Sequence, residues 1–360
     1  MTAPVGIGML GSGFIGDFHT AGLRYVPDVR LVANSGRDPE RREALALKHG
    51  FQRSHASIDA LCADPDVDLV VISLPNELHL EAVRAAAQHG KAVACTKPLG
   101  RNAGEAAEMV RLVLDAGLWH GYLENVVFNA EIVRLRQMIE AGAIGRPVTM
   151  RAREGHSGPH APHFWDVAAA GGGALLDMGS HGVEAARYLF GKEHHIRDVF
   201  SWGATLVHGA RTSGEDNAVT LLRFEDGRVA TIENSWSSKG GLEGRFEVFG
   251  TAGRAISDMS VTQLRAFIGQ SAGYIGEKAD AETGWVFPMP DETYAHGHDA
   301  MMRHMVESFR SGTAPRETFL DGYVVNGVLD AAYRSMKSGR WEALDLDPDL
   351  VGTRAGLVAV

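Results

Sequence analysis

The 360-residue sequence lacks the features of several specialised protein classes. Its two cysteines, Cys62 and Cys95, are too few and too isolated for a disulfide framework or a cysteine-rich zinc site, so a reducing compartment is expected. It has no run of Lys or Arg and a net charge of -10, which disfavours nucleic acid and anionic membranes as partners. It also has no apolar stretch of membrane-spanning length and no signal-peptide pattern at its start. We therefore expect a cytoplasmic protein that binds a small molecule.

The sequence is otherwise typical of a globular protein, with 45% hydrophobic and 22% charged residues, and it is long enough for two domains. Short apolar runs alternate with helical patterns from residue 4 to about 120. Such βα units predict a doubly wound parallel sheet that binds ligands at the carboxyl ends of its strands. The expected strands are 5–10, 29–35, 69–74 and 91–96, and the expected helices are 17–26, 39–50, 79–90 and 103–117.

A different pattern begins near residue 145, where longer strands predominate and two of them fold back at EDG and GTAG. This pattern predicts an α+β domain with one large, mainly antiparallel, open-faced sheet, and it places the domains at 1–122 and 123–360. The expected strands are 147–156, 197–209, 218–236 and 245–259, and the expected helices are 174–190, 296–311 and 317–338. The last helix is a candidate to pack back on the first domain.

A glycine-rich nucleotide motif, GSGFIG, follows the first expected strand and opens the first helix. In that context the glycines allow a tight turn and let a pyrophosphate reach the helix N-terminus. The second strand ends in Ser35, Gly36 and Arg37 instead of the acidic residue that binds an NAD ribose. NADP is therefore favoured and NAD is the alternative. The cofactor-binding residues predicted here are Gly11, Gly13, Phe14, Ile15, Gly16, Ser35, Gly36 and Arg37.

A second glycine-rich stretch, GGGALLDMGSHG (171–182), places Asp177 and His181 four residues apart. On a helix these two side chains share one face. Gly179 and Gly182 would leave the neighbouring surface uncrowded, so a ligand is expected to come close to this helix.

The nucleotide motif, the segment SLPNELHLEAVRAAAQHGKAVACTKPLG (73–100) and the GGGALLDMGSHG stretch occur in an order and spacing that resemble the Gfo/Idh/MocA family of NAD(P)-dependent sugar and polyol oxidoreductases. The likeness covers nearly the whole chain. It implies a Rossmann domain, an open-faced sheet domain that forms homodimers or homotetramers, and a catalytic group of Lys97, Asp177 and His181. Further cofactor contacts are expected from Leu74, Pro75, Asn76, His79, Thr96, Lys97, Pro98 and Asn125.

Two departures from the family pattern concern the binding sites. The glutamate that usually precedes the catalytic lysine is replaced by Thr96, so a contact to the cofactor ribose must be made by a hydroxyl or be lost. The segment YLENVVF (122–128) lacks an arginine often found there. The substrate pocket is therefore expected to differ from those of the best-known members.

The residues that the resemblance implies suit alcohol oxidation, in which a hydride leaves carbon and a proton leaves oxygen. His181 is suited to take the proton because the unperturbed pKa of histidine is about 6.5. Asp177 can orient the substrate hydroxyl or the imidazole, and Lys97 can stabilise the alkoxide. Whether Lys97 or His181 is the base stays open. Asp177 and His181 are expected to face the nicotinamide across the domain cleft.

A histidine-rich segment between residues 153 and 165 is expected to border the site and to decide substrate identity. Its polar groups suit ring hydroxyls, and Phe164 or Trp165 can pack on the C–H face of a sugar. No metal is expected, although His156, His160 and His163 with Glu154, Asp177 or His181 permit a divalent site. The predicted substrate-binding residues are Lys97, Arg153, Glu154, His156, His160, His163, Phe164, Trp165, Asp177 and His181.

These residues predict an NAD(P)-dependent dehydrogenase or reductase acting on a secondary alcohol of a sugar, glycoside, anhydrosugar or cyclic polyol. One alternative is a lyase or glycosidase that oxidises its substrate transiently, with no net reduction of cofactor. The other is a cofactor-binding regulator without catalytic activity.

Overall fold

The computed structural model describes residues 3–259, 266–271, 273–289 and 291–352, which divide into two compact units. The first unit comprises the described residues of Met1–Asn125, His298–Asn326 and Leu346–Val360. The second comprises those of Val126–Gly297 and Gly327–Asp345. The division differs from the expected boundary at 122/123, because two later segments of the chain belong to the first unit.

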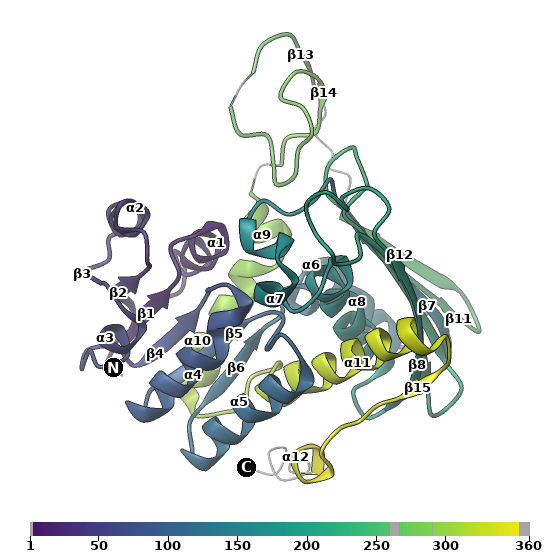
Figure 1. The fold of residues 1–360 in the computed structure, drawn as a ribbon, viewed down its shortest axis with the longest axis horizontal. Coiled ribbons are helices and arrows are strands. Elements are labelled where there is room, and N and C mark those ends of the chain that lie inside the picture. The colour runs from purple at the N-terminus through teal and green to yellow at the C-terminus, as the bar shows by residue number, and fades with distance from the viewer. Residues whose placement is uncertain (1–2, 260–265, 272, 290, 353–360) are drawn as a thin grey trace. The chain divides into compact units, whose positions relative to one another are not determined.

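The first unit contains a six-stranded, all-parallel sheet in the order β3-β2-β1-β4-β5-β6, drawn in purple and blue in Figure 1. This strand order is that of the dinucleotide-binding Rossmann fold. The strands are β1 (Val5–Leu10), β2 (Val29–Ser35), β3 (Arg53–His55), β4 (Leu69–Ile72), β5 (Ala92–Thr96) and β6 (His120–Leu123). The helices are α1 (Phe14–Gly22), α2 (Pro39–His49), α3 (Ile58–Cys62), η1 (Asn76–Leu78), α4 (His79–Gln88), α5 (Ala103–Asp115), α10 (His298–Ser311) and α12 (Pro348–Gly352).

The start of helix α11 (Phe319–Ser338) belongs to the first unit because it packs in that unit's core. Its first residues, Phe319 and Leu320, are buried in the same apolar cluster as the strands β4 and β5. A Cβ atom added to Gly322 would lie 2.9 Å from Leu99 Cβ and 3.0 Å from Tyr122 Cδ2. The residues of α11 from Gly327 onward belong to the second unit.

The second unit is built on a seven-stranded sheet in the order β12-β11-β7-β10-β9-β8-β15. All neighbouring strands are antiparallel except β7 and β10, which are parallel. The expected hairpins at EDG and GTAG join β9 to β10 and β11 to β12. The strands are β7 (Pro147–Gly155), β8 (Ile196–Ala204), β9 (Asn217–Phe224), β10 (Val229–Ser235), β11 (Glu243–Gly250), β12 (Arg254–Asp258) and β15 (Glu342–Ala343).

The two faces of this sheet differ in exposure. Helix α8 (Ala174–Phe190) packs on the face that carries Ala152 and Ile232, both of which are buried. The opposite face leaves Trp202, Val219 and Ile256 exposed to 49%, 37% and 44%. The second domain thus has the mainly antiparallel, open-faced sheet that the sequence predicts. Its other helices are η2 (Val126–Phe128), α6 (Ala130–Glu140), η3 (Pro162–Trp165), α7 (Val167–Ala170) and α9 (Glu292–Ala295).

The segment between β12 and α9 contains a small two-stranded sheet that the sequence did not predict. Strand β13 (Ala266–Ile268) pairs antiparallel with β14 (Gly284–Val286). Within the described residues, no helix is long and apolar enough to cross a lipid bilayer.

Candidate active site

The nucleotide motif of the first unit folds as a tight turn from β1 into α1. Gly11 has a φ of +114°, and a Cβ atom there would lie 2.2 Å from the carbonyl oxygen of Ser73. A Cβ atom on Gly16 would lie 2.3 Å from the carbonyl oxygen of Gly11. Gly13 is exposed, with no atom within 4 Å of its Cβ position. The turn is therefore closed where the chain packs on itself and open at the helix N-terminus, which fits a dinucleotide pyrophosphate.

The end of β2 carries no acidic side chain for a ribose. Ser35 and Gly36 are buried, and a Cβ atom on Gly36 would lie 2.3 Å from Ser12 Oγ. Arg37 is exposed. The next acidic residue in the sequence, Asp38, is the N-cap of α2, and its carboxylate accepts a hydrogen bond from the N–H of Arg41.

Lys97 follows directly after β5, at the carboxyl end of the parallel sheet, and is half-buried. Buried His79 braces the loops around it: Nε2 lies 2.9 Å from the carbonyl oxygen of Leu74, and Nδ1 lies 3.1 Å from those of Pro98 and Leu99. Burial lowers the pKa of His79, and these carbonyls act in the opposite direction. With both ring nitrogens near backbone carbonyls, His79 is suited to hold together the loops that follow β4 and β5. Of the other predicted cofactor residues, Asn76 and Thr96 are buried and Leu74, Pro75 and Asn125 are half-buried.

Asn326 on α11 fixes the backbone beyond Pro98. Its side-chain amide donates to the carbonyl of Gly100 at 2.7 Å and accepts from the N–H of Gly100 at 3.1 Å. Asn326 was not predicted from the sequence, because it lies 226 positions from Gly100.

In the second unit, Asp177 and His181 lie in the first half of α8 and are 7% and 6% exposed. Buried Glu215 holds the start of this helix, because its carboxylate accepts from the N–H of Leu175 and from the hydroxyl of Tyr333, both at 2.9 Å. Burial raises the pKa of Glu215, and its hydrogen bonds oppose that shift. The helix that presents Asp177 and His181 is therefore rigidly anchored.

The glycines of this stretch serve packing within the protein, which corrects the expectation that they make room for a ligand. Cβ atoms on Gly172 and Gly173 would each lie 2.1 Å from an oxygen, the hydroxyl of Tyr333 and the carbonyl of Glu215. A Cβ atom on Gly179 would meet Leu175 at 2.6 Å, and one on Gly182 would meet Ile232 at 2.6 Å. Gly182 therefore lets the helix approach the sheet.

Two side chains from other segments contact the Asp177 carboxylate. The indole N–H of buried Trp236 donates to Asp177 Oδ2 at 3.0 Å. His156 Nε2 lies 3.8 Å from the same oxygen, and His156 Nδ1 accepts from the N–H of Gly158 at 3.0 Å. Because Nδ1 is an acceptor, the ring proton of a neutral His156 lies on Nε2, toward Asp177.

The two aromatic rings of the histidine-rich segment differ in how accessible they are to a sugar. The Arg211 guanidinium lies over the Trp165 ring at 3.7 Å from its centroid, and the ring also contacts Trp236, so a sugar could stack on Trp165 only by displacing Arg211. Phe164 is half-buried and lies against His163 with ring centroids 4.3 Å apart.

Arg153 lies away from the rest of the predicted site. Successive residues of a strand point to opposite faces, so Arg153 shares the open face with its ion-pair partners Glu233 and Glu243. Glu154 is half-buried on the α8 face and lies in register with Asn234. The sequence grouped these neighbours, but the pleat of β7 separates them.

Two family models match successive parts of this chain. Residues 5–121 match the model of the oxidoreductase family with an NAD-binding Rossmann fold. Residues 132–256 match that of the GFO/IDH/MocA C-terminal domain. The chain belongs to the Gfo/Idh/MocA family. Membership confirms the predicted class of function, an NAD(P)-dependent oxidoreductase.

Relatives of this Gfo/Idh/MocA protein include the inositol 2-dehydrogenase of Rhizobium meliloti, which is 30% identical over 342 residues, 93% of this chain and 98% of that protein. Among solved structures, GenD2 from gentamicin A biosynthesis in complex with NAD has a TM-score of 0.89 and 29% identity, over 96% and 98% of the two chains. Levoglucosan dehydrogenase in complex with NADH and levoglucosan has a TM-score of 0.80 and 25% identity, over 95% and 100%.

The second unit of this family member also brings a buried histidine that sequence reasoning missed. His296 follows α9, and its Nδ1 lies 4.0 Å from Glu277 Oε2. Burial lowers the pKa of His296; Glu292 raises it and the charge of His181 lowers it further. The proximity of His296 to His181 could not be predicted, because the two residues are more than a hundred positions apart in the sequence.

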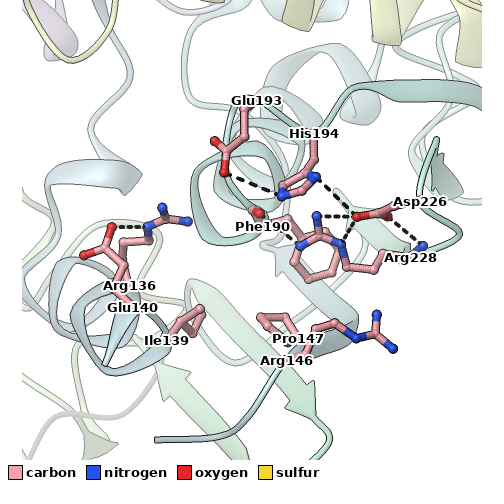
Figure 2. A pocket seen from close by; sticks show the side chains of 10 residues that line it. All are labelled: Arg136, Ile139, Glu140, Arg146, Pro147, Phe190, Glu193, His194, Asp226 and Arg228. Carbon is pink, nitrogen blue, oxygen red and sulfur yellow. Dashed lines mark hydrogen bonds and ion pairs between the residues drawn. The ribbon is translucent and has the colours of Figure 1, made fainter. Parts of the chain in front are cut away.

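A separate cavity of about 260 Å³ lies at the C-terminal end of α8. Figure 2 shows that charged pairs occupy much of its wall, with Arg136 bonded to Glu140, and His194 and Arg228 both bonded to Asp226. Thirteen residues of helix, about 20 Å, separate Asp177 from Phe190 in its wall. This cavity therefore lies far from Asp177, and none of the predicted site residues lines it.

Proposed function

We propose that this protein transfers a hydride between NAD(P) and a secondary alcohol or ketone of a polyhydroxylated ring: a cyclic polyol, sugar, glycoside or anhydrosugar. The observation that carries this proposal is the buried pair of Asp177 and His181 on an anchored helix, in a chain that keeps Lys97 at the end of β5. Relatives named for inositol and levoglucosan support the substrate class.

The proposed catalytic residues divide the proton chemistry among them. When bound, NAD(P) supplies the hydride acceptor for the oxidised carbon. In one case the Lys97 ammonium stabilises the negative charge that develops on the substrate oxygen, and neutral His181 takes the hydroxyl proton. In the other, a neutral Lys97 amine takes that proton and becomes the ammonium that stabilises the oxygen. Asp177 accepts a hydrogen bond from the substrate, and Trp236 and His156 hold its carboxylate in place.

We propose that Glu154, His156, His160, His163 and Phe164 contact the rest of the substrate. They belong to one segment of the second unit, and His156 lies beside Asp177. The sequence prediction also included Arg153 and Trp165. Their ion pairs and stacking give those two side chains other roles.

We propose NADP as the preferred cofactor. Support comes from the end of β2, where Arg37 is exposed and no acidic side chain is available for the 2′-hydroxyl. Replacing Arg37 by Ser is expected to raise the KM for NADP about tenfold and to leave the KM for NAD unchanged. Equal effects on both cofactors would contradict the preference.

We further propose a cytoplasmic homodimer or homotetramer formed through the open sheet face. The exposed Trp202, Val219 and Ile256 support the interface, and two buried free thiols, Cys62 and Cys95, agree with a reducing compartment. Sedimentation of wild type and of Trp202→Glu tests the assembly, since a charge at the interface should shift the protein toward monomer.

The decisive experiment is an absorbance screen of cyclic polyols, sugars, glycosides and anhydrosugars with NAD and NADP in parallel, with and without added divalent metal. Reduced cofactor should accumulate with at least one ring alcohol, and His181→Ala should abolish it while cofactor still binds. Product formed without net reduction of cofactor would contradict the proposal and indicate a lyase or glycosidase.

A further inference from the structure

Lys278 has a backbone conformation that side-chain-bearing residues seldom adopt. Its φ is +59°, and among the described residues only Asp28 shares a positive φ without being glycine. This left-handed conformation costs about 1–2 kcal/mol relative to the ordinary helical one. Such residues persist where their surroundings hold them, and they cluster at functional sites. The position therefore calls for a reason to keep lysine where glycine would fit better.

The side chain of Lys278 is also unusual because it buries a cation. The residue is 9% exposed, and its Nζ donates to the carbonyl oxygen of Gly158 at 3.1 Å. Gly158 is the residue whose N–H bonds to His156 Nδ1, so the ammonium group lies at the turn that orients His156 against Asp177.

The charge of Lys278 reaches the histidine-rich segment. Burial lowers the pKa of His160, and the Lys278 cation lowers it further. A positive charge is thus placed beside two of the proposed substrate-binding histidines, on a residue from a different part of the chain.

The backbone that carries Lys278 is held in place by Glu292. The hydroxyl of Tyr274 donates to Glu292 Oε2 at 2.7 Å, and the N–H of Glu277 donates to Glu292 Oε1. Because Glu292 is itself buried, this brace fixes the turn immediately before Lys278. The backbone that carries the Lys278 side chain is therefore held in one conformation.

We propose that Lys278 is a specificity-determining residue of the substrate site, where its ammonium group donates a hydrogen bond to a hydroxyl or carboxylate oxygen of the substrate bound beside His156 and His160. The inference rests on the proposed function. The Lys278 ammonium group favours rings that carry an oxygen at this position. It disfavours rings that carry an ammonium substituent there, because like charges repel.

Substitution by glycine separates this role from a structural one. Glycine adopts a positive φ without strain, so Lys278→Gly should keep or raise the melting temperature. The loss of the charged donor should raise the KM for a ring alcohol about 10- to 100-fold and change kcat much less. Lys278→Arg should restore part of the affinity, and Lys278→Met should not.

Asp28→Gly is the matched control. Asp28 is the other non-glycine residue with a positive φ among the described residues, and it lies in the first unit. It should keep or raise the melting temperature and leave every KM unchanged. If Lys278→Gly behaves in the same way, with a wild-type KM, the residue is structural and the inference is wrong.

Calorimetric titration with myo-inositol, levoglucosan, D-glucose and D-glucosamine, in the presence of NADP or NAD, gives a readout that does not need turnover. Wild type should bind a neutral ring more tightly than its amino counterpart, and Lys278→Gly should narrow that difference. If Lys278→Gly binds a ring more weakly than wild type does, but wild type reduces no cofactor, the inference is upheld and the proposed function is overturned. If wild type reduces cofactor and Lys278→Gly has an unchanged KM, the proposed function is upheld and the inference is overturned. If wild type binds none of the four compounds, both are overturned.

Discussion

The proposed ligand site of the first unit is formed mainly by backbone atoms, whereas that of the second unit is formed by side chains. Gly11, Gly13 and Gly16 shape a turn whose open end is a helix N-terminus, and all three lie in six consecutive residues. In the second unit, the Asp177 carboxylate is held by Trp236 and His156, which come from separate segments. A backbone site can be encoded locally, but a side-chain site has to be assembled by the fold.

The glycines illustrate the same difference. Gly13 of the nucleotide turn leaves space for a ligand. The glycines of the 171–182 stretch instead allow close packing of Tyr333, Glu215 and Ile232. Glycines therefore serve ligand binding in the nucleotide turn and close packing in the 171–182 stretch.

The largest expected effect is the loss of catalysis without loss of cofactor binding. Lys97→Met should lower kcat by about a thousandfold or more, because it removes the charge that stabilises the substrate oxygen. The Kd for the cofactor, followed by fluorescence, should change little, since the turn from Gly11 to Gly16 is untouched. Lys337→Met, at an exposed position of α11, is the control. A parallel loss of cofactor affinity would show that Lys97 serves mainly to bind it.

Replacing a glycine of the nucleotide turn should destabilise the first unit. In Gly11→Ala the new methyl group would lie 2.2 Å from the Ser73 carbonyl oxygen, at a φ of +114°. We expect a loss of about 2–4 kcal/mol in the free energy of unfolding, measured with urea.

Gly50→Ala provides the matched comparison, because it has a positive φ and nothing within 4 Å of its Cβ position. It should cost only about 1 kcal/mol. Equal losses in the two variants would mean that strain, and not close packing, governs the turn.

Acid should destabilise the first unit through its buried histidines. Burial lowers the pKa of His19 to about 3 and those of His120 and His304 to about 4. Since the unfolded chain binds these protons near pH 6.5 and the folded one does not, stability falls as the pH drops from 6.5 toward 4. Buried His19 and His120 each contribute up to about 2 kcal/mol of loss at pH 5, and half-buried His304 contributes less because solvent screens its charge.

Urea midpoints at pH 7, 6 and 5 measure this loss. His304→Gln should reduce the dependence on pH, because it removes one of the three groups. A variant with the wild-type pH dependence would contradict the role of that histidine.

The smallest expected effect concerns the support of Asp177. Trp236→Phe keeps an aromatic ring but removes the N–H that donates to Asp177 Oδ2. We expect kcat to fall about tenfold, with a smaller change in the melting temperature. Trp202→Phe, on the open face of the sheet, should leave kcat unchanged. If both variants have wild-type kcat, Asp177 needs no support from Trp236.

Much of the fold was predictable because its signals are local. The bounds of β1, β2 and α8 agree with the predicted segments, since apolar runs and bounding glycines mark them. The parallel pairing of β7 with β10 was not predicted, because a strand's own residues do not name its neighbour. The short strand β3 was missed because its three residues, RSH, carry no apolar pattern.

Local order along the chain was enough to predict the nucleotide turn, the βα units, and the shared helix face of Asp177 and His181. Contacts between distant segments decided the rest. Trp236 is 59 positions from Asp177, and Lys278 is 120 positions from Gly158. A hydrogen bond of about 3 Å between such residues depends on how strands, helices and loops pack, and no spacing in the sequence records that distance.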